Sequence, residues 1–397
     1  MNRRRTLLPI PVLLLCMATA ALGLPPVPTI ADELVPEPVL VLPAVLDPLH
    51  WGTARCSDGT PFGFMLELSP TGSREWVLYL EGGGFCEDNA VMCEDRYPRW
   101  TTTPGDEALE YYALVRTRAL FSPDDDWNPT FHDANKAYAF YCSNDVWSGD
   151  TVERRPTSAD PAGWYFSGRA NVKAMVEALQ AYYGLDDAHA ATEVLFAGIS
   201  AGGEGVQAAA AIVYRLLPRV TRKGHLRVVN DAGSVFLFDD PDHRFASTDL
   251  TFKQVMVDAY DFWGSTLNPY CERAQVMMGK RRGECSDEVV VYPFIVRPRP
   301  YGLGLPLFVQ HSSIDGYQLR EHQLEEPEDV ELFRANTLLR FGEVQWTWLW
   351  SGGAFAYHTT LWRDDRWDMG PEGQTLREVL GRFWEDQPPE VVIYGNP

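Results

Sequence analysis

The segment 198–202, with the sequence GISAG, restricts the fold of this chain more than any other feature. It follows the apolar run 194–197 and precedes the alanine-rich stretch 208–211, so we expect a strand, a sharp turn and a helix with Ser200 at the turn. Small residues two positions before and after Ser200 permit the strained turn of a nucleophile elbow, and the helix N-terminus offers free N–H groups to an anion. We therefore predict that Ser200 is a catalytic nucleophile; an inert serine in a glycine-rich turn is the alternative.

The beginning of the chain has the composition of an export signal. Three arginines at 3–5 precede an apolar stretch that turns to small residues, which is typical of a secretory signal peptide and too short for a membrane span. We predict a signal peptide at 1–23, an extended proline-rich spacer at 24–48 and a single catalytic domain at 49–397. No second long apolar segment follows, so we expect no transmembrane segment in the mature chain and a secreted or periplasmic location.

The cysteine count fits export. Six cysteines remain after the signal, and an even number in an exported chain favours disulfides. A metal site is disfavoured because neither a CxxC pair nor an HExxH motif occurs, and we expect no metal or other cofactor. Short separations favour two local bridges and one long one, but six cysteines allow fifteen pairings and spacing leaves the choice open. The six are Cys56, Cys86, Cys93, Cys142, Cys271 and Cys285.

The formal net charge of −21 restricts the class of partner. Nucleic acids and anionic membranes need a basic face, so neither is expected to bind. A highly charged polyuronate is disfavoured as a substrate on the same ground. A small ester or an acylated polysaccharide is compatible with an acidic, solvated surface, and the oligomeric state is left open.

Apolar runs and helical patterns alternate along the chain, which predicts an α/β-hydrolase-like fold. Short, nearly continuous apolar runs are typical of strands covered on both faces, so we expect a mostly parallel sheet with helices on both faces. The segment 236–296 interrupts the alternation and is interpreted as an insertion near the mouth of the site. The predicted strands lie at 76–80, 137–141, 194–197, 226–229, 307–309 and 344–350, and the clearest helices at 168–183 and 205–217.

A nucleophilic serine needs a base, and the base needs an orienting acid. In an α/β-hydrolase layout the acid follows a strand beyond the nucleophile, and the histidine follows the last strand. Asp315 and Asp231 both follow predicted strands, and strand order favours Asp315. His358 lies in a glycine- and aromatic-rich loop after the last predicted strand, whereas His322 lies in a charged run interpreted as a solvated helix face. We predict His358 as the base; a surface loop histidine is the alternative.

An oxyanion hole is the third requirement. The sequence EGGGF at 81–85 follows the strand 76–80, and successive glycines allow backbone N–H groups to face a substrate oxygen. We predict that the N–H groups of Gly83, Gly84 and Ala201 form this hole. A flexible turn is the alternative.

Three segments together resemble the pectin acetylesterase/Notum family of serine carboxylesterases. They are YLEGGGFC at 79–86, YCSNDVWSG at 141–149 and GISAGGEG at 198–205. The resemblance implies an α/β-hydrolase fold, hydrolysis of O-acyl esters and a triad of Ser200, Asp315 and His358. It also implies the disulfides Cys56–Cys142, Cys86–Cys93 and Cys271–Cys285.

The resemblance leaves the acyl group open. Gly84 matches the plant enzymes, whereas the segment around Trp147 is closer to Notum. Phe85, Trp147 and Phe236 are candidates to line an acyl pocket, although apolar residues of this kind also serve as core. The expected function is a secreted serine esterase that removes acetyl groups from a polysaccharide. The alternatives are a Notum-like enzyme that removes a longer acyl chain from a lipid or protein, and a hydrolase-fold binding protein without activity.

Overall fold

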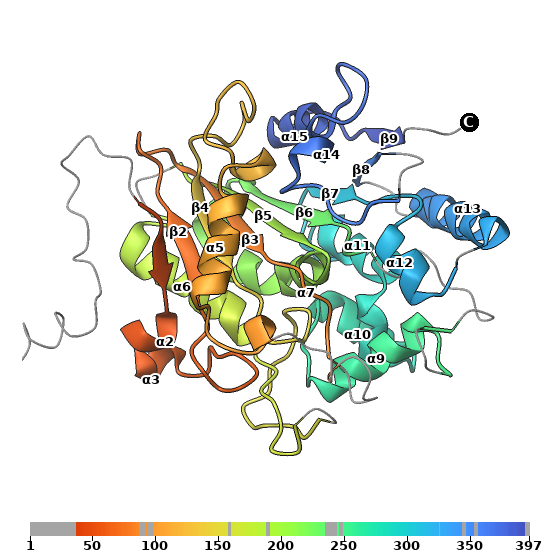
Figure 1. Ribbon diagram of the computed structural model, residues 1–397, viewed down its shortest axis with the longest axis horizontal. Helices are drawn as coiled ribbons and strands as arrows, with labels where there is room; N and C mark the ends of the chain where they lie inside the picture. Colours follow the sequence, from red (N-terminus) through yellow and green to blue (C-terminus); the bar gives the residue numbers. More distant parts are fainter. Residues whose placement is uncertain are drawn as a thin grey trace, which may run out of the picture. The chain divides into compact units, whose positions relative to one another are not determined.

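Nine strands of the described chain form one mixed sheet in the order β1-β2-β4-β3-β5-β6-β7-β8-β9 (Figure 1). β2 pairs antiparallel with β1 and β4, and every neighbouring pair from β4 to β9 is parallel. The strands are β1 Val39–Val41, β2 Phe64–Glu67, β3 Glu75–Leu80, β4 Asn135–Ala139, β5 Glu193–Ile199, β6 Leu226–Asp231, β7 Leu307–Gln310, β8 Trp348–Ser351 and β9 Val391–Ile393.

These features come from a computed structural model, whose described part belongs to one compact unit, Pro36–Pro397. The predicted signal peptide at 1–23 lies outside the described residues. The described residues are 37–86, 93, 98–157, 160–187, 191–234, 244–245, 249–324, 326–343, 347–352 and 356–393.

Helices cover both faces of the sheet, which confirms the predicted fold class (Figure 1). β3 shows the reason, because Leu78 and Leu80 lie in the core formed with α6 and α7, whereas Val77 and Tyr79 lie in the core formed with α5 and α15. Side chains of a strand alternate between faces, so both sets must be apolar when both faces are covered. The helices are α2 Pro43–Leu46, α3 Pro48–Trp51, α5 Asp106–Val115, α6 Gly168–Tyr183, α7 Ala201–Leu216, α8 Pro218–Arg222, α9 Phe252–Phe262, α10 Pro269–Met277, α11 Glu288–Val296, α12 Gly316–Glu321, α13 Pro327–Glu343, α14 Asp364–Trp367 and α15 Leu376–Trp384. No helix within the described residues is long and apolar enough to cross a membrane.

The end of the predicted spacer is part of the fold. Val39–Val41 forms β1 and adds to β2 at the edge of the sheet, and Pro43–Leu46 forms a helical turn against α6. The strand was not expected because Pro36, Pro38 and Pro43 surround it, and proline is tolerated at edge strands and at helix starts. Residues 24–36 of the predicted spacer lie outside the described residues.

The segment predicted as an insertion contains helices α9, α10 and α11. α9 begins with a capping box, in which Thr251 and Gln254 each accept a bond from the other's backbone N–H. The disulfide Cys271–Cys285 links α10 to the short 3-10 helix Arg282–Ser286. Aromatic side chains of this segment pack on Phe85, the residue after the glycine loop.

Three disulfides join the same cysteine pairs that the family resemblance implies. Cys56–Cys142 closes a separation of 86 residues, Cys86–Cys93 one of 7 and Cys271–Cys285 one of 14. The first two lie next to segments that surround the glycine loop, since Cys86 follows Phe85 and Cys142 follows Tyr141. Cross-links therefore fix the chain on both sides of this loop.

The long disulfide is expected to stabilise the fold more than the short one in the insertion. Loop-closure entropy gives about 4.5 kcal/mol for Cys56–Cys142, which spans 86 residues, and about 3 kcal/mol for Cys271–Cys285, which spans 14. We expect paired Cys→Ser variants to lower the free energy of unfolding in that order, measured by denaturant titration. The reverse order would show that strain or residual structure outweighs loop length.

Candidate active site

Ser200 lies at a strained turn between β5 and α7. Its φ of 52° and ψ of −123° are unusual for a residue with a side chain, and its side chain does not cap the helix that it begins. Gly202 and Gly198 make this turn possible. A Cβ at Gly202 would overlap the carbonyl oxygen of Leu80, and one at Gly198 would overlap the carbonyl oxygen of Gly202. The hydroxyl is thereby held at the carboxyl end of the parallel strands.

Three side chains form a hydrogen-bonded chain at this point. His358 Nε2 lies 2.8 Å from Ser200 Oγ, and His358 Nδ1 lies 2.8 Å from Asp315 Oδ2. The other oxygen of Asp315 accepts the N–H groups of Tyr317 and Gln318, each at 2.9 Å, at the start of α12. The cap therefore fixes the carboxylate, which in turn orients the imidazole, and the geometry is that of a serine–histidine–acid triad.

The electrostatics of the pair favour a charged imidazole. Burial lowers the pKa of His358, but the charge and hydrogen bond of Asp315 outweigh it, with a smaller contribution from Asp231, so the pKa lies above 6.5. Burial likewise raises the pKa of Asp315, and the charge and hydrogen bond of His358 leave it lowered. Asp315 is fully buried and the His358 side chain is 22% exposed, so of these two residues only His358 is accessible to solvent.

Asp231, the competing acid, makes no hydrogen bond to the imidazole. Its Oδ2 accepts the backbone N–H groups of Thr360 at 2.8 Å and Leu361 at 2.7 Å. His322, predicted on a solvated helix face, is instead 5% exposed, so that interpretation was wrong. It ends α12, and its ring packs against Phe245 and Phe252.

The glycine loop lies directly beside the elbow. A Cβ at Gly82 would lie 2.7 Å from the Ile199 carbonyl oxygen and 2.9 Å from Ser200 Cβ, so only glycine allows this approach. Gly83 and Gly84 have φ values of 153° and 70°, which favour glycine. Among the described residues, no acceptor is bound to the N–H groups of Gly83, Gly84 or Ala201. Such free donors beside a nucleophile are the groups that an oxyanion hole requires.

Glu81 supports the loop, and sequence reasoning missed it. Its carboxylate forms an ion pair with Arg99 and accepts the Tyr141 N–H at 2.9 Å. Burial raises the pKa of Glu81, and the Arg99 charge partly opposes this. The carbonyl of Glu81 accepts the indole N–H of Trp147 at 3.0 Å, and Trp147 is fully buried. An acid directly after a buried strand was the available signal for this role.

The three residues predicted to line an acyl pocket, Phe85, Trp147 and Phe236, have different surroundings. Phe85 is 4% exposed and lies with its ring centroid 5.9 to 6.2 Å from those of Phe245, Phe252 and Trp263. Trp147 lies beneath the glycine loop, as described above. Phe236 lies outside the described residues.

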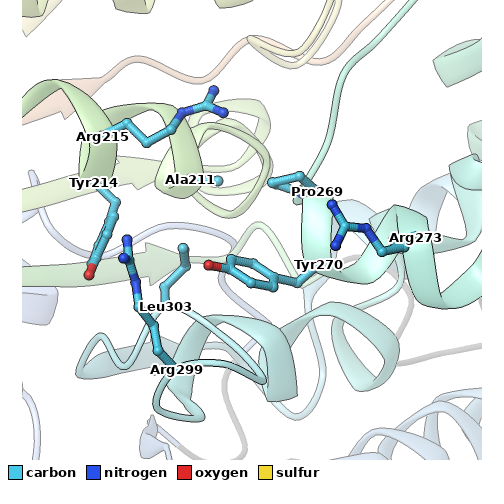
Figure 2. A pocket seen from close by; sticks show the side chains of 8 residues that line it. All are labelled: Ala211, Tyr214, Arg215, Pro269, Tyr270, Arg273, Arg299 and Leu303. Atoms are coloured by element: carbon cyan, nitrogen blue, oxygen red, sulfur yellow. The ribbon is translucent and has the colours of Figure 1, made fainter.

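A cavity of about 340 Å³ lies elsewhere, between α7, α10 and the loop after α11 (Figure 2). Tyr214, one of its lining residues, is about 20 Å along α7 from Ser200 at 1.5 Å per residue. Three arginines line it without an ion pair to any described acid, and one of them, Arg299, lies 4.9 Å from the centre of the Tyr214 ring. It contains no residue of the triad. The full lining is Ala211, Tyr214, Arg215, Pro269, Tyr270, Arg273, Arg299 and Leu303.

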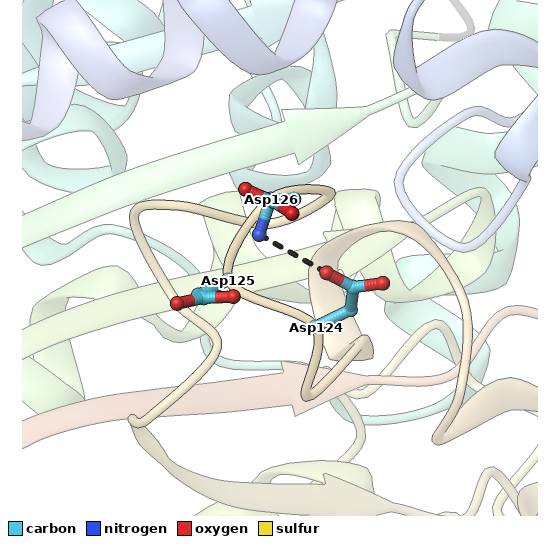
Figure 3. Close-up of side chains that lie close together, drawn as sticks. All are labelled: Asp124, Asp125 and Asp126. Atoms are coloured by element: carbon cyan, nitrogen blue, oxygen red, sulfur yellow. Dashed lines mark hydrogen bonds between the residues drawn. The ribbon is translucent and has the colours of Figure 1, made fainter.

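One described group of acids has the spacing to hold a cation: Asp124, Asp125 and Asp126, all exposed (Figure 3). Its geometry has a local explanation, because Asp124 Oδ1 accepts the backbone N–H groups of Asp126 and Trp127 in a turn. The group shares no residue with the triad or the glycine loop.

Replacing Gly82 should disable the site. Gly82→Ala places a methyl group against the elbow, so the glycine loop must move away. We expect Ser200 to react at least about 100-fold more slowly with a fluorophosphonate probe, the usual effect of losing one oxyanion donor. Gly342→Ala, in α13 with open space around the added methyl group, is the matched control and should react like the unaltered chain. Equal rates for the two variants would contradict this account of the loop.

Comparison with known proteins finds curated relatives that are named carboxylesterases. The chain is 31% identical over 254 residues to the palmitoleoyl-protein carboxylesterase notum1a of Danio rerio, covering 62% of this chain and 47% of that protein. It is 28% identical over 354 residues to the palmitoleoyl-protein carboxylesterase NOTUM of Schmidtea mediterranea, covering 83% and 60%. The chain thus spans about half the length of these curated relatives.

The fold has a solved counterpart. The structure of the Wnt deacylase Notum from Drosophila superposes with a TM-score of 0.67 at 21% identity, covering 86% of this chain and 93% of that one. The family model described as pectinacetylesterase matches residues 40–334, a range that includes the elbow, the glycine loop and Asp315. The chain therefore belongs to the pectinacetylesterase family.

Proposed function

We propose that this chain is a secreted serine esterase that hydrolyses short O-acyl esters, in particular O-acetyl esters on a polysaccharide. The observation that carries the proposal is the hydrogen-bonded chain from Ser200 through His358 to Asp315, beside three N–H groups that no described residue accepts. Membership of the pectinacetylesterase family supports the same chemistry.

Acylation follows from this geometry. Ser200 Oγ attacks the ester carbonyl carbon while its proton passes to His358 Nε2, 2.8 Å away. The carbonyl oxygen becomes an anion, which the N–H groups of Gly83, Gly84 and Ala201 stabilise. His358 then donates its proton to the leaving alkoxide, so the alcohol departs and the acyl group remains on Ser200.

Deacylation repeats these steps with water. His358 takes a proton from the water, the hydroxide adds to the acyl carbonyl, and the proton returns to Ser200 Oγ as the acid leaves. Throughout, Asp315 accepts the Nδ1–H of His358 and so keeps Nε2 free to accept a proton. The protein groups present account for every proton transfer.

The surroundings of Phe85 support a short acyl group. The Phe85 ring follows the glycine loop and is packed by Phe252 and Trp263, so aromatic side chains fill the space next to it. A fatty acyl chain needs an elongated apolar cavity next to the nucleophile, and the cavity of about 340 Å³ between described residues does not serve this purpose, because it lies at the other end of α7. An acetyl group needs neither.

A second candidate is removal of a longer acyl chain from a protein or lipid. It is favoured by the names of the relatives, which are palmitoleoyl-protein carboxylesterases. The same aromatic side chains would have to move apart to admit such a chain.

Secretion is supported by the three disulfides, because such bonds persist mainly in oxidising compartments. The arginine-led apolar stretch at the beginning of the sequence gives the same indication. A periplasmic location is equally compatible with both observations.

A series of p-nitrophenyl esters of increasing acyl length tests the substrate. We expect kcat/KM to be highest for acetate and to fall toward octanoate, because the rings around Phe85 leave little room. A strong preference for octanoate would favour the second candidate. Ser200→Ala should abolish hydrolysis and fluorophosphonate labelling; an unaltered chain that shows neither reaction would indicate a binding protein instead.

The pH dependence tests the role of Asp315. The base must be neutral to accept a proton, so kcat/KM is lost as the pH falls through the pKa of His358, which lies above 6.5. Asp315→Asn removes the main stabilisation of the imidazolium, so the acid limb should move to lower pH while the plateau falls roughly 10⁴-fold. A pH–rate profile measures both effects. An unmoved acid limb would contradict the assignment of Asp315.

A further inference from the structure

Asp231 connects the nucleophile to the base. It is the last residue of β6, and its carbonyl oxygen accepts the N–H of Ser200 at 2.8 Å. Its carboxylate accepts the N–H groups of Thr360 and Leu361, two and three residues after His358. Asp231 is thus hydrogen-bonded both to the backbone of Ser200, the expected proton donor, and to the backbone just after His358, the expected proton acceptor.

The base depends on such an anchor. His358 lies in the irregular segment 356–363 between β8 and α14, so no helix or strand fixes its backbone. Asp315 holds the ring through Nδ1, but the ring can reach Ser200 only if its own peptide is also in place. Just beyond His358, the Asp231 carboxylate accepts the N–H groups of Thr360 and Leu361, and the Leu361 carbonyl accepts the N–H of Leu120 at 3.1 Å. The bonds from Asp231 come from a residue that is also hydrogen-bonded to Ser200.

The Asp231 carboxylate is an unusual group to retain for stability alone. It is fully buried, and within the described part of the chain it forms no ion pair and its Oδ1 accepts no hydrogen bond of normal geometry, although the Thr360 side chain also lowers its pKa. Burial raises its pKa to about 7, although the Leu361 and Thr360 N–H groups and the His358 charge oppose the rise. Burying a carboxylate without an ion pair costs free energy of folding, which the hydrogen bonds from Thr360 and Leu361 offset in part.

The charged and titratable groups around the pair are few. Asp231 faces His358 and the phenols of Tyr79 and Tyr357. His358 also faces Asp315, Arg320 and His311, and burial lowers the pKa of His311 to about 4, which leaves it neutral. Among the described residues, Asp231 and Asp315 are therefore the two groups whose negative charges favour the imidazolium.

We propose that Asp231 is a positioning residue for His358: its ionised carboxylate fixes the His358 segment and supplies a second negative charge near the imidazole. This inference rests on the proposed esterase function. It makes activity depend on two carboxylates, of which only Asp315 touches the base. Protonating Asp231 removes its charge and weakens its hold on the Thr360 and Leu361 N–H groups.

The wild-type pH profile gives the first test. As the pH falls toward and below about 7, Asp231 and His358 both gain protons, and each protonation lowers activity. The acid limb of log kcat/KM for p-nitrophenyl acetate should therefore have a slope above one. A wild-type slope of one, together with an unchanged plateau in the variant described next, overturns the proposal.

The second test is Asp231→Asn, which keeps the shape and one oxygen acceptor but removes the charge. We expect the plateau of kcat/KM to fall about 10- to 100-fold, because the Thr360 and Leu361 N–H groups exchange a charged acceptor for a neutral one. The acid limb should have a slope of one and move to lower pH, because the imidazolium loses a stabilising charge. A wild-type plateau and slope in this variant would overturn the proposal.

Asp186→Asn is the matched control. Asp186 is also buried, and its Oδ1 accepts two backbone N–H groups, those of Arg219 and Val220, at the far end of α7. Its substitution should leave the wild-type plateau within about twofold and the slope above one. A change of slope in this control too would show that any buried aspartate has the effect, which overturns the proposal. Absence of Ser200-dependent hydrolysis in the unaltered chain would instead refute the proposed function.

Discussion

The active-site geometry depends on one backbone contact, between the elbow and the end of β3. Gly202 lies so close to the Leu80 carbonyl that only a hydrogen fits between them, and Gly82 approaches Ile199 and Ser200 in the same way. These approaches bring the first turn of α7 and the glycine loop to one point. Ser200 and the N–H groups proposed as oxyanion donors are therefore positioned by main chain, which has less freedom than side chains.

The remaining groups reach this point because the strands are parallel. The carboxyl ends of neighbouring parallel strands lie at one edge of a sheet, so the loops after β3, β5, β6, β7 and β8 meet there. The ends of these strands and the loops after them supply, in this order, the proposed oxyanion donors Gly83 and Gly84, then Ser200, Asp231, Asp315 and His358. The site residues are far apart in sequence, and the pairing of the strands that precede them makes them neighbours in space.

Much of this arrangement could be predicted from the sequence. The strand before Ser200 and the helix after it have strong local signals, and α6 begins and ends at the predicted residues 168–183. The order of strands sufficed to prefer Asp315 to Asp231, and the structure places Asp315 against His358. A strand that is covered on both faces is recognisable from the sequence because nearly all of its residues are apolar, whichever elements cover it.

Other features depend on tertiary contacts and could not be predicted. β1 has three residues among prolines, and only its pairing with β2 makes it a strand. His322 appears solvated in a charged run, yet Phe245 and Phe252, more than 65 residues earlier in the chain, bury it. The anchoring contact of Asp231 joins residues about 130 positions apart, and no local pattern records such a bond.

The two disulfides that flank the glycine loop also carry a consequence for the cell. Cys86 directly follows the loop, and Cys142 directly follows Tyr141, whose N–H holds Glu81. Such bonds form in oxidising compartments and are rare in a reducing cytosol, so there the chain would lack both cross-links next to the glycine loop. The N–H groups proposed as oxyanion donors would then be held in place by packing and hydrogen bonds alone.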